Sequence, residues 1–133
     1  MGAYRVERDK MKLDHIQLAM PKGGEDAARS YFIDILDMEE ETKPYPLSER
    51  GGCWFRHGSV RLHIGAQSDF SPQKKAHPAF LTHDLKELET KLKERGHTIV
   101  WDDSLPNRER FYSTDPFGNR LEFMKDGDGF SQK

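Results

Sequence analysis

The stretch of sequence that decides the fold is RFYSTDPFGNRLE, residues 110–122. Polar and apolar residues alternate at both of its ends, and Pro116 and Gly118 in the middle are typical of a turn. The stretch therefore predicts a β-hairpin in which residues 110–114 pair with residues 120–125.

Working outward from this hairpin, we find the same order of elements twice. A strand and a helix precede the hairpin, and a strand and a helix also precede an earlier hairpin around His57 and Gly58. An internal repeat of this kind decides the architecture, and it predicts a single α+β domain, residues 1–133. We expect strands at residues 12–20, within 39–50, and at 52–55, 59–66, 77–82 and 98–101. We expect helices at residues 25–36 and 84–95. The expected units are module one at about 12–67, module two at about 76–125, and a loose tail at 126–133.

Composition excludes several classes of partner. The 133 residues are 35% hydrophobic and 33% charged, and the formal net charge is −2. A chain this close to neutral lacks the basic surface expected of a nucleic-acid-binding protein. No stretch approaches the roughly 20 apolar residues needed to cross a bilayer. A single cysteine, Cys53, rules out an internal disulfide and favours a reducing, cytoplasmic setting.

Four residues with catalytic or metal-binding chemistry occupy matching places in the two modules. His15 and His77 each lie where the first strand of a module is expected to begin, and His63 and Glu122 lie in the last strands. The two pairs are similarly spaced, because 48 positions separate His15 from His63 and 45 separate His77 from Glu122. Alternation along the strands places them on the polar faces. A pseudo-twofold repeat would therefore bring all four to equivalent places.

Imidazoles and a carboxylate around one point are typical of a metal site. His15, His77 and Glu122 would form a set of two histidines and one carboxylate that leaves positions open for substrate or water. His63 leaves two alternatives, because a fourth ligand would close a tetrahedral zinc site but would leave two positions open on a six-coordinate ion. A polar pocket of hydrogen-bonded histidines without a metal is the competing interpretation.

Several motifs extend this interpretation over nearly the whole chain. They are LDHIQL at residues 13–18, Tyr31-Phe32 followed by Leu36, HPAF at residues 77–80, and RFYSTDPFGNRLE at residues 110–122. In these motifs the chain resembles the glyoxalase / bleomycin resistance / extradiol dioxygenase superfamily, also called the vicinal oxygen chelate superfamily. The resemblance implies paired βαβββ modules that form a curled mixed sheet around a central pocket. It also implies a homodimer.

The resemblance implies that His15, His77 and Glu122 are the family's three recurring ligands for a divalent metal, which would be Ni, Zn, Mn, Co or Fe. In the glyoxalase I branch a glutamate usually stands where this chain has His63, so His63 is a departure from that branch. The expected catalytic residues are Glu122 and His63. Such a metal would act as a Lewis acid on two adjacent oxygens of a substrate.

The expected function is that of a metal-dependent lyase or isomerase acting on a small oxygen-rich molecule. Arginines suit an anionic substrate and aromatic residues could wall the pocket. The residues expected to bind the substrate are Arg61, Arg110, Arg120, Tyr112, Trp54 and Gln17. Two alternatives stay open: a non-catalytic protein that sequesters a small molecule, as bleomycin-resistance proteins do, and a ferrous ring-cleaving dioxygenase.

Overall fold

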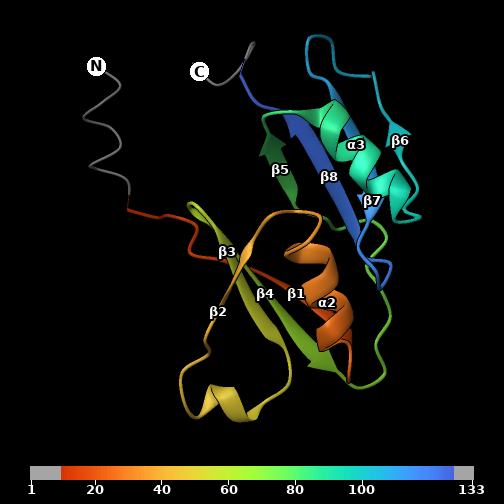
Figure 1. The fold of residues 1–133 in the computed structure, drawn as a ribbon. Helices are drawn as coiled ribbons and strands as arrows, with labels where there is room; N and C mark the ends of the chain where they lie inside the picture. Colours follow the sequence, from red (N-terminus) through yellow and green to blue (C-terminus); the bar gives the residue numbers. More distant parts are fainter. Residues whose placement is uncertain (1–9, 128–133) are drawn as a thin grey trace.

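The computed structural model describes residues 10–127, which form two mixed sheets of four strands, each covered by one α-helix (Figure 1). The first module comprises β1 (Ile16–Pro21), α2 (Glu25–Phe32), β2 (Glu39–Glu41), the 3-10 turn η1 (Leu47–Glu49), β3 (Cys53–His57) and β4 (Val60–Gln67). The second comprises β5 (Ala79–Thr82), α3 (Leu85–Glu94), β6 (Val100–Trp101), β7 (Arg110–Thr114) and β8 (Arg120–Lys125). This is the repeated βαβββ order, so the predicted fold is confirmed.

The two sheets have the same topology. Their strand orders are β1-β4-β3-β2 and β5-β8-β7-β6. In each sheet the first and last strands of the module run parallel, and the remaining neighbours are antiparallel. The register places Trp54 opposite His63 in the first sheet and Tyr112 opposite Glu122 in the second. The two modules therefore present equivalent positions, but their sheets stay separate and do not close into one.

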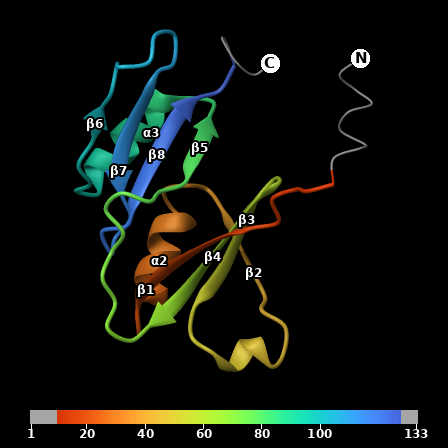
Figure 2. The same cartoon turned by 180° about the vertical axis from the view of Figure 1, so that it is seen from behind.

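Both helices lie on the same side of the molecule, and the opposite faces of the two sheets are seen from behind in Figure 2. Apolar side chains of both modules meet in one continuous core, which includes Phe32, Phe55, Leu92, Phe111 and Leu121. Burial of this apolar surface is the main favourable term in the stability of the domain. Among residues 10–127, no helix is long and apolar enough to cross a membrane.

The turn at the centre of the deciding stretch connects the modules. The buried Asp115 accepts hydrogen bonds from the backbone N–H groups of Phe117 and Asn119, both at 2.9 Å. The Asn119 amide donates to Asp115 Oδ2 and to the backbone carbonyl of Ala19 on β1, both at 2.8 Å. The hairpin of module two is thus tied to the first strand of module one.

Several expected boundaries are corrected. Strand β1 begins at Ile16 rather than at residue 12, and β5 and β6 are also shorter at their N-terminal ends. Regular helix ends at Phe32, not at residue 36, and the chain then winds through turns to Asp37, whose φ of 63° is left-handed. Residues 128–133, which hold most of the expected loose tail, lie outside the described residues.

The lone cysteine is where the sequence places it, in a strand. Cys53 is buried in β3. Burial raises the pKa of its thiol to about 11, which makes it a packing residue and not a nucleophile.

Candidate metal site

In the first module, His15 and His63 form part of a stack of three rings. The His15 and His63 centroids lie 4.1 Å apart with 19° between the planes. Trp54 stacks on the other face of His63 at 4.1 Å and 3°. His15 lies directly before β1, and β4 and β3 carry His63 and Trp54 as opposed residues. The stack follows from this register and buries the His63 ring.

This stacking bears on the two alternatives for His63. An imidazole binds a metal in the plane of its ring, along the lone pair of a nitrogen. Two rings stacked at 4.1 Å with a tilt of 19° have planes that meet only far from either ring. With the rings so arranged, His15 and His63 cannot hold the same ion. Burial and the neighbouring His15 also lower the pKa of His63, which favours its neutral form.

In the second module, His77 and Glu122 are in direct contact. The Nε2 atom of His77 lies 3.0 Å from Glu122 Oε1, and the Glu122 side chain is only 7% exposed. Its other oxygen, Oε2, accepts a hydrogen bond from Arg110 Nη1 at 2.9 Å. Arg110 in turn pairs with Asp102 at 3.1 Å. Two carboxylates and one guanidinium give this group a net charge of −1 when His77 is neutral, which suits a bound cation.

In both His15 and His77, Nδ1 makes a hydrogen bond, so Nε2 is the nitrogen that a metal could bind. The Nδ1 atom of His15 lies 2.9 Å from an oxygen of Asp14, and that of His77 lies 2.8 Å from the carbonyl of Lys75. Each Nδ1 therefore donates its proton, as the histidines of metal sites do to a carboxylate or carbonyl partner. The Nε2 atom of His15 is left for a metal, whereas Nε2 of His77 donates to the Glu122 carboxylate and would release that proton on binding a metal. The donor types thus fit a divalent metal, and in the second module a ring nitrogen and a carboxylate oxygen already lie side by side.

The two halves of the expected ligand set are not assembled at one point. Within residues 10–127, no three His, Cys, Asp or Glu side chains lie close enough to hold one metal ion. His15 and His63 line a cavity of about 830 Å³ on the first sheet, and His77 lines a neighbouring cavity of about 710 Å³. Gln17 lines both cavities, so they adjoin along β1. Each module supplies a pair, and a complete set needs both pairs brought together.

The comparisons with known proteins give the family. No family model matches the chain, and neither does any curated protein. A solved structure of a protein assigned to the glyoxalase family, from Bacillus anthracis, is 42% identical, has a TM-score of 0.83, and is aligned over 90% of this chain and 98% of its own. The chain belongs to the glyoxalase family. This confirms the resemblance that its motifs carry.

Two more distant structures share the fold of this glyoxalase family chain. The fosfomycin resistance protein FosX from Listeria monocytogenes is 14% identical with a TM-score of 0.72, over 90% of this chain and 97% of its own. A lactoylglutathione lyase from Agrobacterium tumefaciens is 16% identical with a TM-score of 0.67, over 89% of this chain and 96% of its own. At these identities the likeness concerns the fold alone.

The residues expected to bind substrate are divided between the two halves. Trp54, Arg61 and Gln17 line the same cavity as His15 and His63. Arg120 lines the cavity that contains His77, and its guanidinium lies 4.0 Å from the centre of the Tyr112 ring. The Tyr112 ring also meets His77 edge-on at 5.3 Å. These five side chains thus lie beside one or the other pair, and their binding of a substrate stays a prediction.

Arg110, also expected to bind substrate, lies against Glu122. Its side chain is only 11% exposed, and its two terminal nitrogens donate to Tyr112, Glu122 and Ser104 in addition to the ion pair with Asp102. Both terminal nitrogens are thus engaged, whereas Nε is buried without a hydrogen-bond partner among the described residues. The contact with Glu122 adds a supporting position to the substrate-binding role expected of Arg110.

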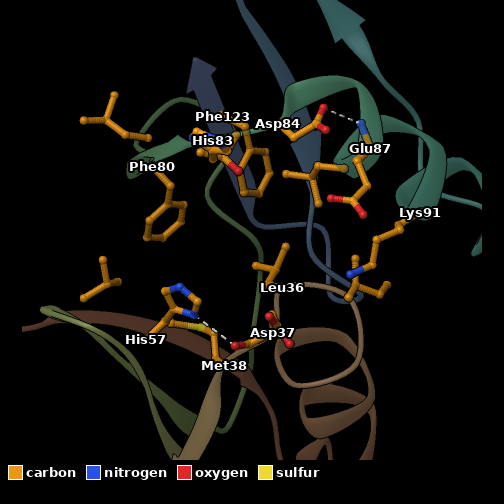
Figure 3. Close-up of a pocket in the computed structure, with 15 residues that line it drawn as sticks. Leu36, Asp37, Met38, His57, Phe80, His83, Asp84, Glu87, Lys91 and Phe123 are labelled. Carbon is orange, nitrogen blue, oxygen red and sulfur yellow. Dashed lines mark hydrogen bonds between the residues drawn. The ribbon is translucent and has the colours of Figure 1, made fainter. Parts of the chain in front are cut away.

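A third cavity, of about 400 Å³, lies at the junction of the modules (Figure 3). It is bordered by the segment after α2, the β3–β4 turn, β5 and the start of α3, with Phe80 and Phe123 among its apolar residues. None of the expected site residues lines it. We therefore place the candidate site on the two cavities that hold the histidines.

Sequence reasoning missed the partners that orient the site. Asp14 precedes His15 in the chain, so an acidic neighbour next to a candidate ligand was a visible signal for its role. The Lys75 carbonyl gave no signal, because a backbone group is present at every residue. Asp102 and Ser104 precede the hairpin in a loop, and only the folded chain shows that they bind Arg110.

Proposed function

We propose that this glyoxalase family chain is a metal-dependent lyase or isomerase that acts on a small oxygen-rich substrate. The observation that carries the proposal is the arrangement of His77 between the Lys75 carbonyl and Glu122. It brings Nε2 of His77 within 3.0 Å of a Glu122 oxygen, in a hydrogen bond whose proton a bound metal would replace. Such a pair of donors is stabilised by a cation between them, with the ligand atoms moving apart to admit it.

The metal would be held by His15, His77 and Glu122, in a site completed between two copies of the chain. In support, the two pairs stay apart within one chain, and β1 and β5 are unpaired edges of their sheets. A twofold dimer that places module one of one copy against module two of the other would form two identical sites. A homodimer with shared sites is therefore part of the proposal.

Within such a site a divalent metal, whether Ni, Zn, Mn, Co or Fe, would supply Lewis-acid chemistry at two adjacent substrate oxygens. The protein side chains would do the rest. His63, stacked beside His15, would take a proton from the substrate at a ring nitrogen. Arg61 and Arg120 would bind a negatively charged group, and Trp54 would exclude water from one side of the pocket.

The two other functions remain predictions. A sequestering protein would use the same cavities without a metal, and a ring-cleaving dioxygenase would use the same ligand types with ferrous iron. The Asp14 carboxylate and the Lys75 carbonyl, which hold Nδ1 of the two histidines, favour a metal-binding role over sequestration, because they leave Nε2 as the nitrogen for a metal. The expected cytoplasmic location also remains a prediction.

The test is the metal content of untagged protein, measured by elemental mass spectrometry after incubation with each candidate ion. We expect about one ion per chain in the wild type, and its loss in His15→Ala, His77→Ala and Glu122→Ala. His83→Ala is the matched control, because His83 is exposed and lies before α3, away from both histidine cavities. A wild type that binds no ion, or an His77→Ala variant that binds as much as the wild type, would overturn the proposal.

A further inference from the structure

Arg110 holds one oxygen of Glu122, and His77 faces the other. Its Nη1 atom donates to Glu122 Oε2 at 2.9 Å, whereas Oε1 faces His77. The same guanidinium is fixed on its other side by Ser104 at 3.0 Å and by Asp102 at 3.1 Å. With partners on both sides, the guanidinium has little freedom to move away from the carboxylate.

The pseudo-twofold repeat supplies an internal comparison. Glu122 lies opposite Tyr112, and His63 lies opposite Trp54, so Arg110, two residues before Tyr112, corresponds to Gly52. A side chain is excluded at Gly52, since a Cβ atom would lie 2.5 Å from the Ile64 carbonyl oxygen and φ is +112°. The module with the carboxylate therefore has an arginine at this position, and the module with the imidazole has a glycine.

We propose that Arg110 is a positioning residue that makes Glu122 a one-oxygen metal ligand. This inference rests on the proposed metal-binding function. A carboxylate can bind a metal through one oxygen or through both. The hydrogen bond to Oε2 occupies the second oxygen, so only Oε1 remains for the metal that His77 also binds. A coordination position is thereby kept for the substrate, which needs two.

The charge of Arg110 has a second consequence. A guanidinium beside a ligand carboxylate withdraws part of its negative charge from the metal, which disfavours hard ions that depend on carboxylate oxygens, such as Mn²⁺. Ions held mainly by imidazole nitrogen, such as Zn²⁺, lose less. Arg110 should therefore set both the number of ligand atoms and the preference among ions.

The experiment compares the wild type with Arg110→Met, which has a side chain of similar length without charge or donors. In Arg110→Met both oxygens of Glu122 become free to bind. We expect bound Co²⁺ to gain a ligand atom, seen as a weaker visible absorption band. We also expect the ratio of Mn²⁺ to Zn²⁺ affinity to rise about tenfold, the size of effect typical of partners that orient a ligand. A purely structural role would weaken both ions in parallel and leave the band unchanged.

Two further variants keep the test decisive. Arg110→Lys retains the charge without the forked donors, so it should shift the Co²⁺ band in the same direction by less, and it serves if Arg110→Met does not fold. Arg95→Met removes an exposed arginine at the end of α3 that lines neither histidine cavity, and it should change nothing. If the wild type binds no ion, the proposed function fails together with this inference. If it binds and neither Arg110 variant alters the band or the ratio, only the role of Arg110 is refuted.

Discussion

Two variants that each lack a metal should together rebuild a site, because the expected ligands are divided between the modules. His15→Ala damages the pair of module one, and His77→Ala damages the pair of module two. In a dimer with shared sites, each site takes one module from each copy. A heterodimer of the two variants therefore has one site with both defects and one site with none.

The expected magnitude follows from counting sites. Each variant alone should hold no metal. When equal amounts are unfolded and refolded together, random pairing makes about half of the dimers mixed, and one of their two sites is intact, so the mixture should contain roughly a quarter of the wild-type metal. A heterodimer purified with two different affinity tags should contain about half. Elemental mass spectrometry measures both quantities.

A matched pair of variants provides the control. His77→Ala and Glu122→Ala damage the same module, so every site of their heterodimer carries one defect and no metal should be recovered. If the mixture of His15→Ala and His77→Ala also recovers none, while the wild type binds a metal, the site closes within one chain. That result would refute the argument from the separated pairs and would require the two sheets to move together.

Three further predictions concern stability, each measured by denaturant unfolding. Asn119→Ala should cost about 2 kcal/mol, since it removes two hydrogen bonds and leaves the Ala19 carbonyl without a donor; a loss near zero would show that the turn does not connect the modules. Tyr31→Phe should leave stability unchanged or raise it, because the buried Tyr31 hydroxyl has no hydrogen-bond partner among the described residues, and a clear loss would contradict this. The N–H of Gly52 donates to Glu25 and lowers the pKa of Glu25 below 4.5, so its stabilisation is present above that pH and is lost as the pH falls through the lowered pKa. The difference in unfolding free energy between wild type and Glu25→Gln should therefore shrink in acid, and a difference that persists there would refute the assignment.

The order of the elements was predictable because it depends on local patterns. The alternation in β4 reports which residues are buried, and Leu62 and Ile64 are buried as that pattern requires. The helix cap at Asp84 was equally local, and its carboxylate accepts from Glu87 N–H at 3.1 Å. Boundaries were less accurate. The strand expected from residue 12 pairs with β4 only from Ile16 onward. Pairing with another strand, and not propensity, determines where a strand begins.

The sequence names the members of the candidate site but not how they lie relative to one another. Equivalent spacing in a repeat singles out His15, His63, His77 and Glu122, because equivalent strands must place them at equivalent positions. It does not report how the two sheets lie relative to each other, since that depends on contacts between residues far apart in the chain, such as the bond from Asn119 to Ala19. The separation of the two pairs is therefore a property of the folded chain that no periodicity encodes.

The same limit applies to His63, and the structure supplies a physical reason for its departure from glutamate. A buried carboxylate needs a compensating charge or donors, and Glu122 has Arg110. At the equivalent place in module one, Gly52 has no room for a side chain, so a carboxylate at position 63 would lack this partner. A neutral imidazole does not require one and gains contact from the Trp54 ring. The two modules thus differ at two linked positions, the glycine or arginine and the imidazole or carboxylate. With Gly52 in place, the imidazole of His63 can be buried without a charged partner. A His63→Glu variant should accordingly lose stability, and a second change that adds an arginine at Gly52 should not restore it, because the Ile64 carbonyl blocks the position.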